Sequence, residues 1–277
     1  MPHIDLGELK YYYEIHGEGA ETITILNGLT MSTVAWAAQV KDFSPHFRVL
    51  LLDMRGQGQT DRTDEENYPL SRQADDLARL LDKLGIAKTH LFALSYGGIV
   101  AQYFALQYPD RLGRLVLADT LAWSDEVNRA LHNAIVMAWE AGGTRLRFRV
   151  MLPITFGANF LKLAAPVIPV LEQAAEALPW PGTKAMMVGV LDHDLRDRLK
   201  DIRAETLLIF GEEDRFTPLH QAKLLQEGIP GATLRVIPGV GHAAPLENPP
   251  VVDRLALAFF RGEPLPDQGR ETANSCC

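Results

Sequence analysis

The sequence predicts an α/β fold, in which a mostly parallel β-sheet is flanked by helices and carries an inserted helical segment. Three observations support this class. Short apolar and β-branched runs alternate with helical patterns along most of the chain. The alternation stops between residues 121 and 203, where the sequence becomes helical, apolar and punctuated by proline. A chain of 277 residues with 47% hydrophobic content can also bury a sizeable core.

Strands alternating with helices imply that most of the strands are parallel. The clearest helix covers residues 71–84, where leucines recur at helical spacing, Ser71 is expected to cap the start and Gly85 follows the end. Two further helices are expected over residues 98–108 and 250–260. Seven runs have the length and composition of strands: residues 10–16, 22–26, 48–53, 90–94, 115–118, 206–210 and 233–237.

The net charge and the residue content of the chain exclude several classes of binding partner. The formal net charge of -8 at pH 7 argues against nucleic acid and anionic membrane surfaces, which favour basic patches. The chain shows no charged-then-apolar leader and no run of about 18 apolar residues, so we expect a cytoplasmic protein without a membrane span. No residues have metal-ligand spacing, and neither a metal nor a cofactor is expected. The oligomeric state stays open.

Ser95 stands between an apolar run and an apolar helix, in the octapeptide Leu-Phe-Ala-Leu-Ser-Tyr-Gly-Gly of residues 91–98. A sharp strand-to-helix turn strains the backbone and requires small residues two positions away, a demand that Ala93 and Gly97 meet. Such a turn exposes the hydroxyl and leaves the Tyr96 amide at a helix N-terminus, where negative charge is stabilised. The pattern predicts a nucleophile; the alternative interpretation is an ordinary helix N-cap.

A serine hydroxyl needs a base, and the base needs a partner that fixes its tautomer. Asp214 and His242 each lie in a loop directly after a predicted strand. Open parallel sheets place their ligands at these strand ends, so the two side chains are candidates for the acid and the base. Thr217 and Pro218, which follow the candidate acid, are expected to cap and begin a helix.

The turn at Ser95 and the chain order Ser95, Asp214, His242 resemble the α/β-hydrolase superfamily, over residues 4–260 approximately. The resemblance implies the α/β-hydrolase fold and a catalytic triad formed by these three residues. Some members carry their acid after the sixth strand, where Asp119 stands in this chain. Asp214 has the more typical loop and chain order, and we prefer it.

Residues 25–32, followed by Trp36, resemble the oxyanion loop of the family, His-Gly-x-x-x-Ser, with Asn27 in place of the histidine. By position, the backbone amide of Leu29 is the second oxyanion donor and pairs with that of Tyr96. Since backbone donors carry this chemistry, the change to asparagine affects support of the loop and leaves the oxyanion hole intact.

The loop Asp-Met-Arg-Gly-Gln-Gly resembles a second family motif, Asp-x-Arg-Gly-x-Gly, and we expect Asp53 and Arg55 to be structural scaffolding. In the family, an insertion such as residues 121–203 folds over the nucleophile and shapes the substrate pocket; this segment is called the cap below. The adjacent Cys276 and Cys277 predict neither a metal site nor a structural disulfide. The expected organisation is a hydrolase core formed by residues 1–120 and 204–262, the cap, and a disordered tail over residues 263–277.

Arg145, Arg147 and Arg149 alternate with apolar residues, and form either a solvated face or a set that holds an anionic substrate group. His132 and His193 are expected at the surface of the cap. The expected substrate pocket is walled by aromatic residues of the cap and by one residue of the oxyanion loop: Trp123, Trp139, Phe156, Trp180 and Asn27.

Together these features predict a serine hydrolase that cleaves a small, largely apolar carboxylic ester or lactone through an acyl-enzyme. The sequence around Ser95 resembles enol-lactone hydrolases and carboxylesterases. Asn27-Gly28 together with Ala-x-Ser-aromatic-Gly-Gly also resembles a hydroxyacyl acyltransferase. A thioesterase or such an acyltransferase is therefore one alternative, and a receptor-like member that binds a ligand with little turnover is another. The expected partner is a small-molecule ester, lactone or thioester.

Overall fold

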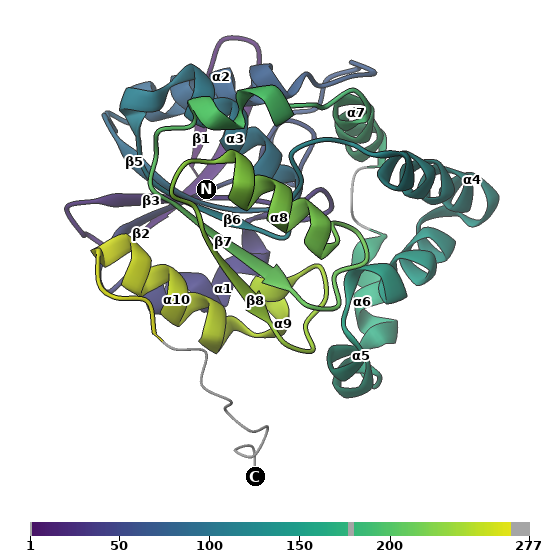
Figure 1. The fold of residues 1–277 in the computed structure, drawn as a ribbon. Helices are drawn as coiled ribbons and strands as arrows, with labels where there is room; N and C mark the ends of the chain where they lie inside the picture. The colour runs from purple at the N-terminus through teal and green to yellow at the C-terminus, as the bar shows by residue number, and fades with distance from the viewer. Residues whose placement is uncertain (1, 177–179, 267–277) are drawn as a thin grey trace.

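The computed structural model describes residues 2–176 and 180–266, so residues 267–277 of the predicted tail, including both cysteines, lie outside the described residues. Eight strands form one sheet in the order β1-β2-β4-β3-β5-β6-β7-β8 (Figure 1). β1 and β2 pair antiparallel with their neighbours, and every pair from β4 to β8 is parallel. The predicted mostly parallel sheet is confirmed. The strands are β1 (His3–Asp5), β2 (Lys10–His16), β3 (Thr22–Leu26), β4 (Arg48–Leu52), β5 (Thr89–Leu94), β6 (Leu112–Ala118), β7 (Thr206–Gly211) and β8 (Thr233–Ile237).

Helices cover both faces of the sheet, which explains why the central strands β3, β5 and β7 are buried along their whole length. All six residues of β5 are buried, and alternate side chains enter opposite layers. Leu91 and Ala93 pack in the layer under α2, α3 and α8, whereas Phe92 and Leu94 pack in the layer under α1 and α10. The core helices are α1 (Ala37–Phe43), α2 (Leu70–Lys83), α3 (Tyr96–Gln107), α8 (Leu219–Gly228), α9 (Ala244–Glu247) and α10 (Pro249–Arg261).

Helix α2 begins one residue before its predicted start, so Ser71 lies inside its first turn and is not the cap. Pro69 occupies the N-cap position instead, without a side-chain hydrogen bond. The predicted end is confirmed: Gly85 has φ +66°, and the Ile86 amide donates to the Leu81 carbonyl oxygen. Helices often end in this way, at a residue in the left-handed conformation that glycine adopts without strain.

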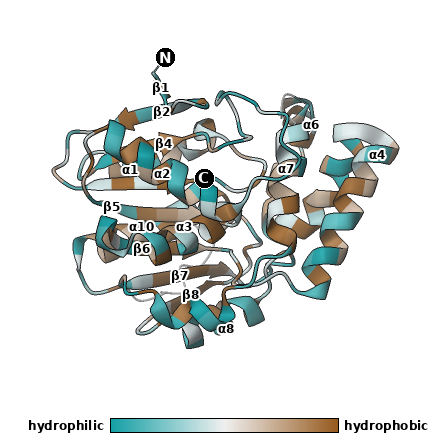
Figure 2. Ribbon diagram, turned by 90° about the horizontal axis from the view of Figure 1, so that it is seen from above, coloured by the Kyte–Doolittle hydropathy of each residue, from teal (hydrophilic) through white to brown (hydrophobic). Residues whose placement is uncertain are grey.

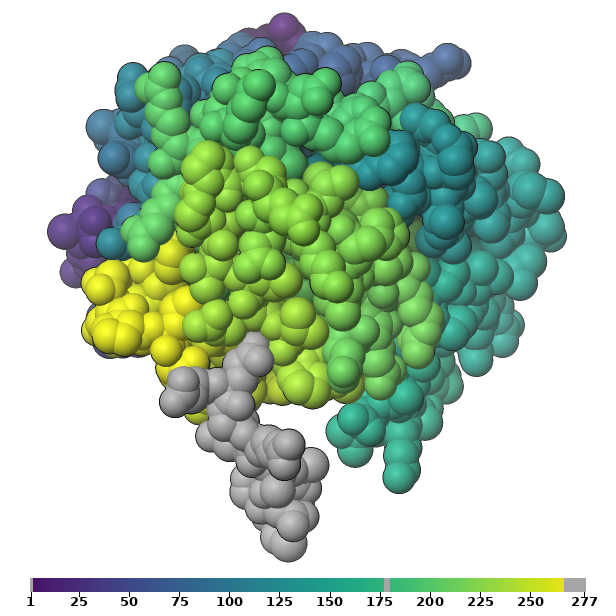
Figure 3. Space-filling view, in the orientation of Figure 1, coloured from purple at the N-terminus to yellow at the C-terminus, as the bar shows by residue number. Residues whose placement is uncertain are grey.

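Between β6 and β7 the described chain is helical, in α4 (Glu126–Thr155), α5 (Ala158–Ala164), α6 (Ile168–Ala175) and α7 (Trp180–Leu191). These helices lie along one side of the core (Figures 2 and 3). Helix α4 is broken at Gly142 and Gly143; the latter has φ +64° and ψ −160°, a conformation that only glycine adopts readily. No helix within the described residues is both long and apolar enough to cross a lipid bilayer. The boundaries of the cap as a unit stay a prediction.

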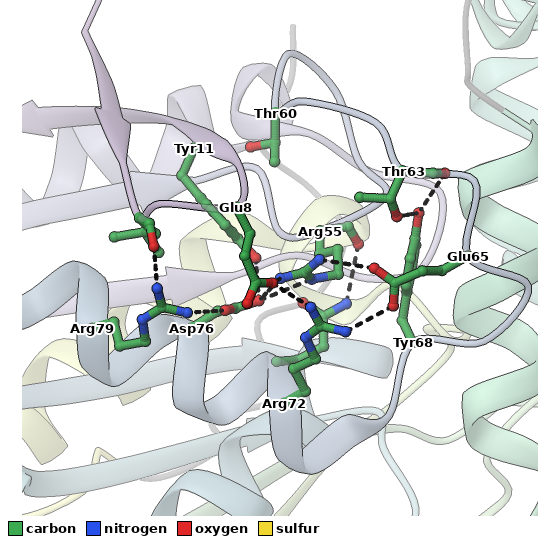
Figure 4. A network of polar contacts seen from close by, with 12 residues as sticks. Glu8, Tyr11, Arg55, Thr60, Thr63, Glu65, Tyr68, Arg72, Asp76 and Arg79 are labelled. Carbon is green, nitrogen blue, oxygen red and sulfur yellow. Dashed lines mark hydrogen bonds and ion pairs between the residues drawn. The ribbon is translucent and has the colours of Figure 1, made fainter.

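Arg55, in the loop after β4, is the centre of a buried ionic network (Figure 4). Its Nε donates to Asp76 Oδ2 over 3.0 Å, and its Nη1 lies 3.2 Å from Glu65 Oε1. The Tyr11 hydroxyl of β2 also donates to Asp76, and burial, followed by the charge of that carboxylate, holds the tyrosine pKa well above its ordinary value. The network therefore joins β2, α2 and the loop after β4, the arrangement expected of scaffolding.

We predict that Asp76→Asn lowers the free energy of unfolding by about 3 kcal/mol, because it leaves the Arg55 guanidinium buried with only the partly exposed Glu65 and the exposed Glu8 as acidic neighbours. Chemical denaturation measures the change. Glu8→Gln is the matched control, since Glu8 is an exposed member of the same network, and its removal should have little effect. Equal stability of the Asp76→Asn and Glu8→Gln proteins would contradict the scaffold role.

Candidate active site

Ser95 joins β5 to α3 in a strained conformation, with φ +54° and ψ −116°. Its amide donates to the Ala118 carbonyl oxygen over 2.9 Å, which ties the turn to β6. A Cβ atom at Gly97 would lie 2.5 Å from the Leu26 carbonyl oxygen, so the turn requires glycine there. The methyl group of Ala93, by contrast, is buried in the core. The Ser95 side chain makes no capping hydrogen bond to α3 and is directed elsewhere.

The Ser95 hydroxyl, His242 and Asp214 form one hydrogen-bonded chain. His242 Nε2 lies 2.8 Å from Ser95 Oγ, and His242 Nδ1 lies 3.0 Å from Asp214 Oδ2. The other carboxylate oxygen of Asp214 accepts from the amides of Phe216 and Thr217, each over 2.8 Å. Burial alone would raise the pKa of Asp214, but the charge of His242 and these hydrogen bonds lower it below its ordinary value. The acid is thereby kept ionised.

Thr217 has a different role from the predicted one. Its hydroxyl donates to Asp214 Oδ2 over 2.6 Å and lies 3.2 Å from His242 Nδ1. Helix α8 begins only at Leu219, with Pro218 at the N-cap position. The predicted helix-cap signal therefore marks a side chain that orients the candidate acid. Its hydroxyl proton needs an acceptor, which a carboxylate supplies and the N–H groups at the start of a helix do not.

Asp119, the alternative acid, does not contact His242 in the structure. Its fully buried carboxylate accepts from the Gly211 amide at the end of β7 and from the Ala244 amide, each over 2.8 Å. Burial, followed by the charge of Asp214, raises the pKa of Asp119 well above its ordinary value. Asp119 therefore joins the end of β7 to the segment just after His242.

Two backbone amides beside Ser95 have no acceptor among the described residues: those of Leu29 and Tyr96. Both residues line the cavity that contains Ser95. The Gly28 carbonyl oxygen accepts from Gln57 Nε2 over 2.7 Å. In a trans peptide the carbonyl and the following N–H point in opposite directions, so this bond directs the Leu29 N–H away from Gln57. The two amides have the properties that an oxyanion hole requires.

Asn27 lies beneath the loop and does not line the cavity, in contrast to its prediction as a pocket residue. Its Nδ2 donates to Gln57 Oε1 over 3.1 Å, and its Oδ1 accepts from Trp36 Nε1 over 2.6 Å. Gln57 is a supporting residue that sequence reasoning missed. The signal for it was a polar residue at the variable position of Asp-x-Arg-Gly-x-Gly, next to an oxyanion loop that lacks its histidine.

The cavity beside Ser95 has a volume of about 20 Å³, enough for roughly one water molecule. A substrate therefore needs neighbouring side chains to move. His132, predicted at the surface, is buried and belongs to this lining, and burial lowers its pKa to about 4. His193 is also buried, and burial lowers its pKa to about 4 as well. The lining residues are Leu29, Ser95, Tyr96, Ile99, Thr120, Leu121, His132, Val190, Phe216 and Thr217.

None of the four predicted aromatic walls lines this cavity directly. Trp139 and Trp180 stack with ring centroids 5.0 Å apart, in an apolar cluster of the cap that also contains Phe216 and packs against Leu29. These two tryptophans thus adjoin the lining. Trp123 instead lies under the Arg196 guanidinium, and Phe156 stacks on Phe160. Within residues 2–176 and 180–266, no group of three or more histidine, cysteine or acidic side chains is placed to hold a metal ion.

Comparison with known proteins agrees with the observed fold. Residues 21–249 match the family model described as alpha/beta hydrolase fold. The chain is similar to a putative carbamate hydrolase, RutD, of Azorhizobium caulinodans, with 30% identity over 264 residues that cover 94% of this chain and 98% of the relative.

Some solved structures are similar to this one over more than nine-tenths of the chain. An alpha/beta hydrolase enzyme, MGS-M2, from a Medee basin deep-sea metagenome library has a TM-score of 0.90 and 30% identity, over 96% of this chain and 100% of that one. A thermophilic esterase from Thermogutta terrifontis has a TM-score of 0.83 and 28% identity, over 92% of this chain and 94% of that one. The proteins that this chain resembles are therefore hydrolases.

Proposed function

Because the chain belongs to the α/β-hydrolase fold family, we propose that it is a serine hydrolase that cleaves a small, largely apolar carboxylic ester or lactone through an acyl-enzyme. The observation that carries the proposal is the hydrogen-bonded chain from Ser95 Oγ through His242 to Asp214, beside two amides without acceptors. Similarity to an esterase supports the choice of carboxylic esters.

In the proposed reaction, His242 Nε2 takes the proton of Ser95 as Oγ attacks the substrate carbonyl. The amides of Leu29 and Tyr96 stabilise the oxyanion of the tetrahedral intermediate. His242 then gives its proton to the leaving alcohol as the ester bond breaks, which leaves the acyl group on Ser95. Water, deprotonated by the same imidazole, attacks the acyl-enzyme; the imidazolium then returns the proton to Ser95 Oγ as the acyl–oxygen bond breaks and the acid is released. Asp214 orients the imidazole and stabilises its charged form throughout.

The lining of the cavity favours an apolar acyl group. Leu29, Ile99, Val190 and Phe216 surround the nucleophile, and the apolar cluster of the cap continues from them. Burial of each methylene group contributes about 0.8 kcal/mol, so catalytic efficiency should rise along a short series of acyl chains until the pocket is filled.

We predict that Ser95→Ala lowers the rate of ester hydrolysis by about 10⁴- to 10⁶-fold without changing the fold, because the hydroxyl supplies covalent chemistry and little packing. A panel of esters, lactones and thioesters of increasing acyl length, run with and without a hydroxyacyl acceptor, measures the activity, and circular dichroism checks the fold. Ser71→Ala, the same change in the first turn of α2, is the control.

Several results of this panel would overturn the proposal. Parent rates in the Ser95→Ala protein would exclude the nucleophile. Product formation that depends on the acceptor would favour an acyltransferase, and saturable binding without turnover would favour a receptor-like protein. A preference for peptides over every apolar ester would contradict the account of the acyl pocket.

We predict that Asp214→Asn lowers kcat by about 10⁴-fold, since the amide cannot hold His242 in the tautomer that accepts the serine proton. Asp119→Asn should instead lower stability and reduce kcat much less, because that carboxylate contacts two backbone amides and not the imidazole. Measured per folded protein, a larger loss of kcat in Asp119→Asn would reverse the assignment.

We predict that Gln57→Leu lowers kcat by about 10- to 100-fold with a smaller change in KM, because an unsupported Gly28–Leu29 peptide no longer presents its amide to the transition state. Gln59→Leu, the same change at an exposed position of the same loop, is the control. An effect on KM alone would show that Gln57 does not act through the oxyanion hole.

A further inference from the structure

The three alternating arginines of α4 separate onto two faces of the helix. Successive helical residues are about 100° apart, so Arg145 and Arg149 share one face, whereas Arg147 points to the other. The Nε atoms of Arg145 and Arg149 donate to the same oxygen of Glu172, over 2.9 Å and 3.1 Å. These two arginines therefore hold α4 against α6, and Arg147 needs a separate explanation.

Arg147 is a buried cation without an anionic partner among the described residues. The residue is 4% exposed, and its guanidinium lies over the Trp180 ring, 5.4 Å from the centroid. No described residue accepts a hydrogen bond from it, and its Nε is fully buried without a partner. Contact with an aromatic face offsets only part of the cost of removing a guanidinium from water. Within residues 2–176 and 180–266, this charge is therefore uncompensated.

Two other buried nitrogens of the cap also lack hydrogen-bond partners: Trp180 Nε1, on the ring that contacts Arg147, and His132 Nδ1. His132 lines the cavity that contains Ser95. Trp180 belongs to the apolar cluster of the cap, which shares Phe216 and Leu29 with that cavity. Buried donors in folded proteins nearly always have partners, so the unpartnered N–H groups of Arg147 and Trp180, whose side chains are in contact, indicate an acceptor that arrives with a ligand.

We propose that Arg147 binds a carboxylate carried by the substrate, at the end remote from the carbonyl that Ser95 attacks. The inference rests on the proposed hydrolase function and adds an anionic group to its largely apolar substrate. The planar guanidinium pairs with a carboxylate through two parallel hydrogen bonds, and the Trp180 ring holds that plane from one side. A single cation in apolar surroundings balances a monoanion; a phosphate dianion would remain partly uncompensated.

A matched pair of esters tests the proposal: the 4-nitrophenyl monoester of adipic acid, whose six-carbon acyl chain ends in a carboxylate, and 4-nitrophenyl hexanoate, whose chain ends in a methyl group. The measured quantity is the ratio of kcat/KM for the two. We expect Arg147→Met to lower this ratio by about 10- to 100-fold, the range for a hydrogen-bonded charge pair. A second pair with the carboxylate on the alcohol side covers the opposite orientation of the substrate.

Two further variants distinguish recognition from a structural role. Arg145→Met removes a cation from the exposed face of the same helix and should leave the ratio unchanged. Arg147→Lys keeps the charge without the planar fork and should give an intermediate ratio. The Tm of Arg147→Met should be no lower than that of the parent, because the variant removes an unpaired buried charge. An unchanged ratio in both pairs, or an equal loss on charged and neutral esters with a lower Tm, would overturn the proposal.

A binding measurement separates this proposal from the proposed function. In the Ser95→Ala protein, hexanoate should bind at least 10-fold more tightly than hexanol, and Ser95→Ala with Arg147→Met should lose that difference. Loss of it in a protein whose parent hydrolyses no ester would support the anion site and refute the hydrolase. Ester hydrolysis by the parent, with hexanoate binding that does not depend on Arg147, would refute the anion site alone.

Discussion

The strained turn at Ser95 is the constraint on which the candidate site depends. A positive φ at a residue with a side chain persists only where the surroundings enforce it. Here β5 is buried between β3 and β6, the Ser95 carbonyl accepts from Thr120, and Gly97 allows α3 to approach the backbone of residues 26 and 27. One turn thus determines the position of the candidate nucleophile, of the Tyr96 amide and of the predicted oxyanion loop that it contacts.

Two buried polar side chains, Asp119 and Gln57, fix the positions of the loops around Ser95. Asp119 joins the end of β7 to the segment after His242, and Gln57 holds the Gly28 carbonyl. Neither side chain is needed to form or break a bond in the proposed reaction. Each still sets the position of a group that is needed, because a short loop bonded at one point has little freedom at the next. Substitution of either residue should therefore affect both folding and chemistry, in different proportions.

The local sequence was enough to predict most strands and the three residues of the hydrogen-bonded chain. Buried parallel strands form short apolar and β-branched runs, and the polar residues directly after them mark the loops at the edge of the sheet. Strand β1 was missed because three largely exposed residues carry no periodic signal. Thr217 was misread because a capping threonine and one that bonds a distant carboxylate have the same local sequence. The cap was hardest: its side-chain directions depend on the break at Gly143 and on tertiary packing, so His132 was placed at the surface and Trp123 in the pocket.

Arg55 in the core and Arg147 in the cap are both buried, but they differ in whether acidic side chains compensate their charge. This difference separates an arginine that supports the fold from one proposed to bind a ligand. Arg55 has Asp76 and Glu65 as partners, so its burial is compensated within the folded chain. Arg147 is buried to a similar extent, yet it has no hydrogen-bonding or anionic partner among the described residues and lies over a tryptophan ring. Buried amides of the core, such as Gln73 and Gln102, leave an oxygen unpaired but donate through their nitrogens, which is a smaller cost than an unpaired charge. Among the described residues, the chain thus supplies anionic partners for Arg55 and none for Arg147. This difference is why we assign the first arginine to the scaffold and propose the second for recognition of a ligand.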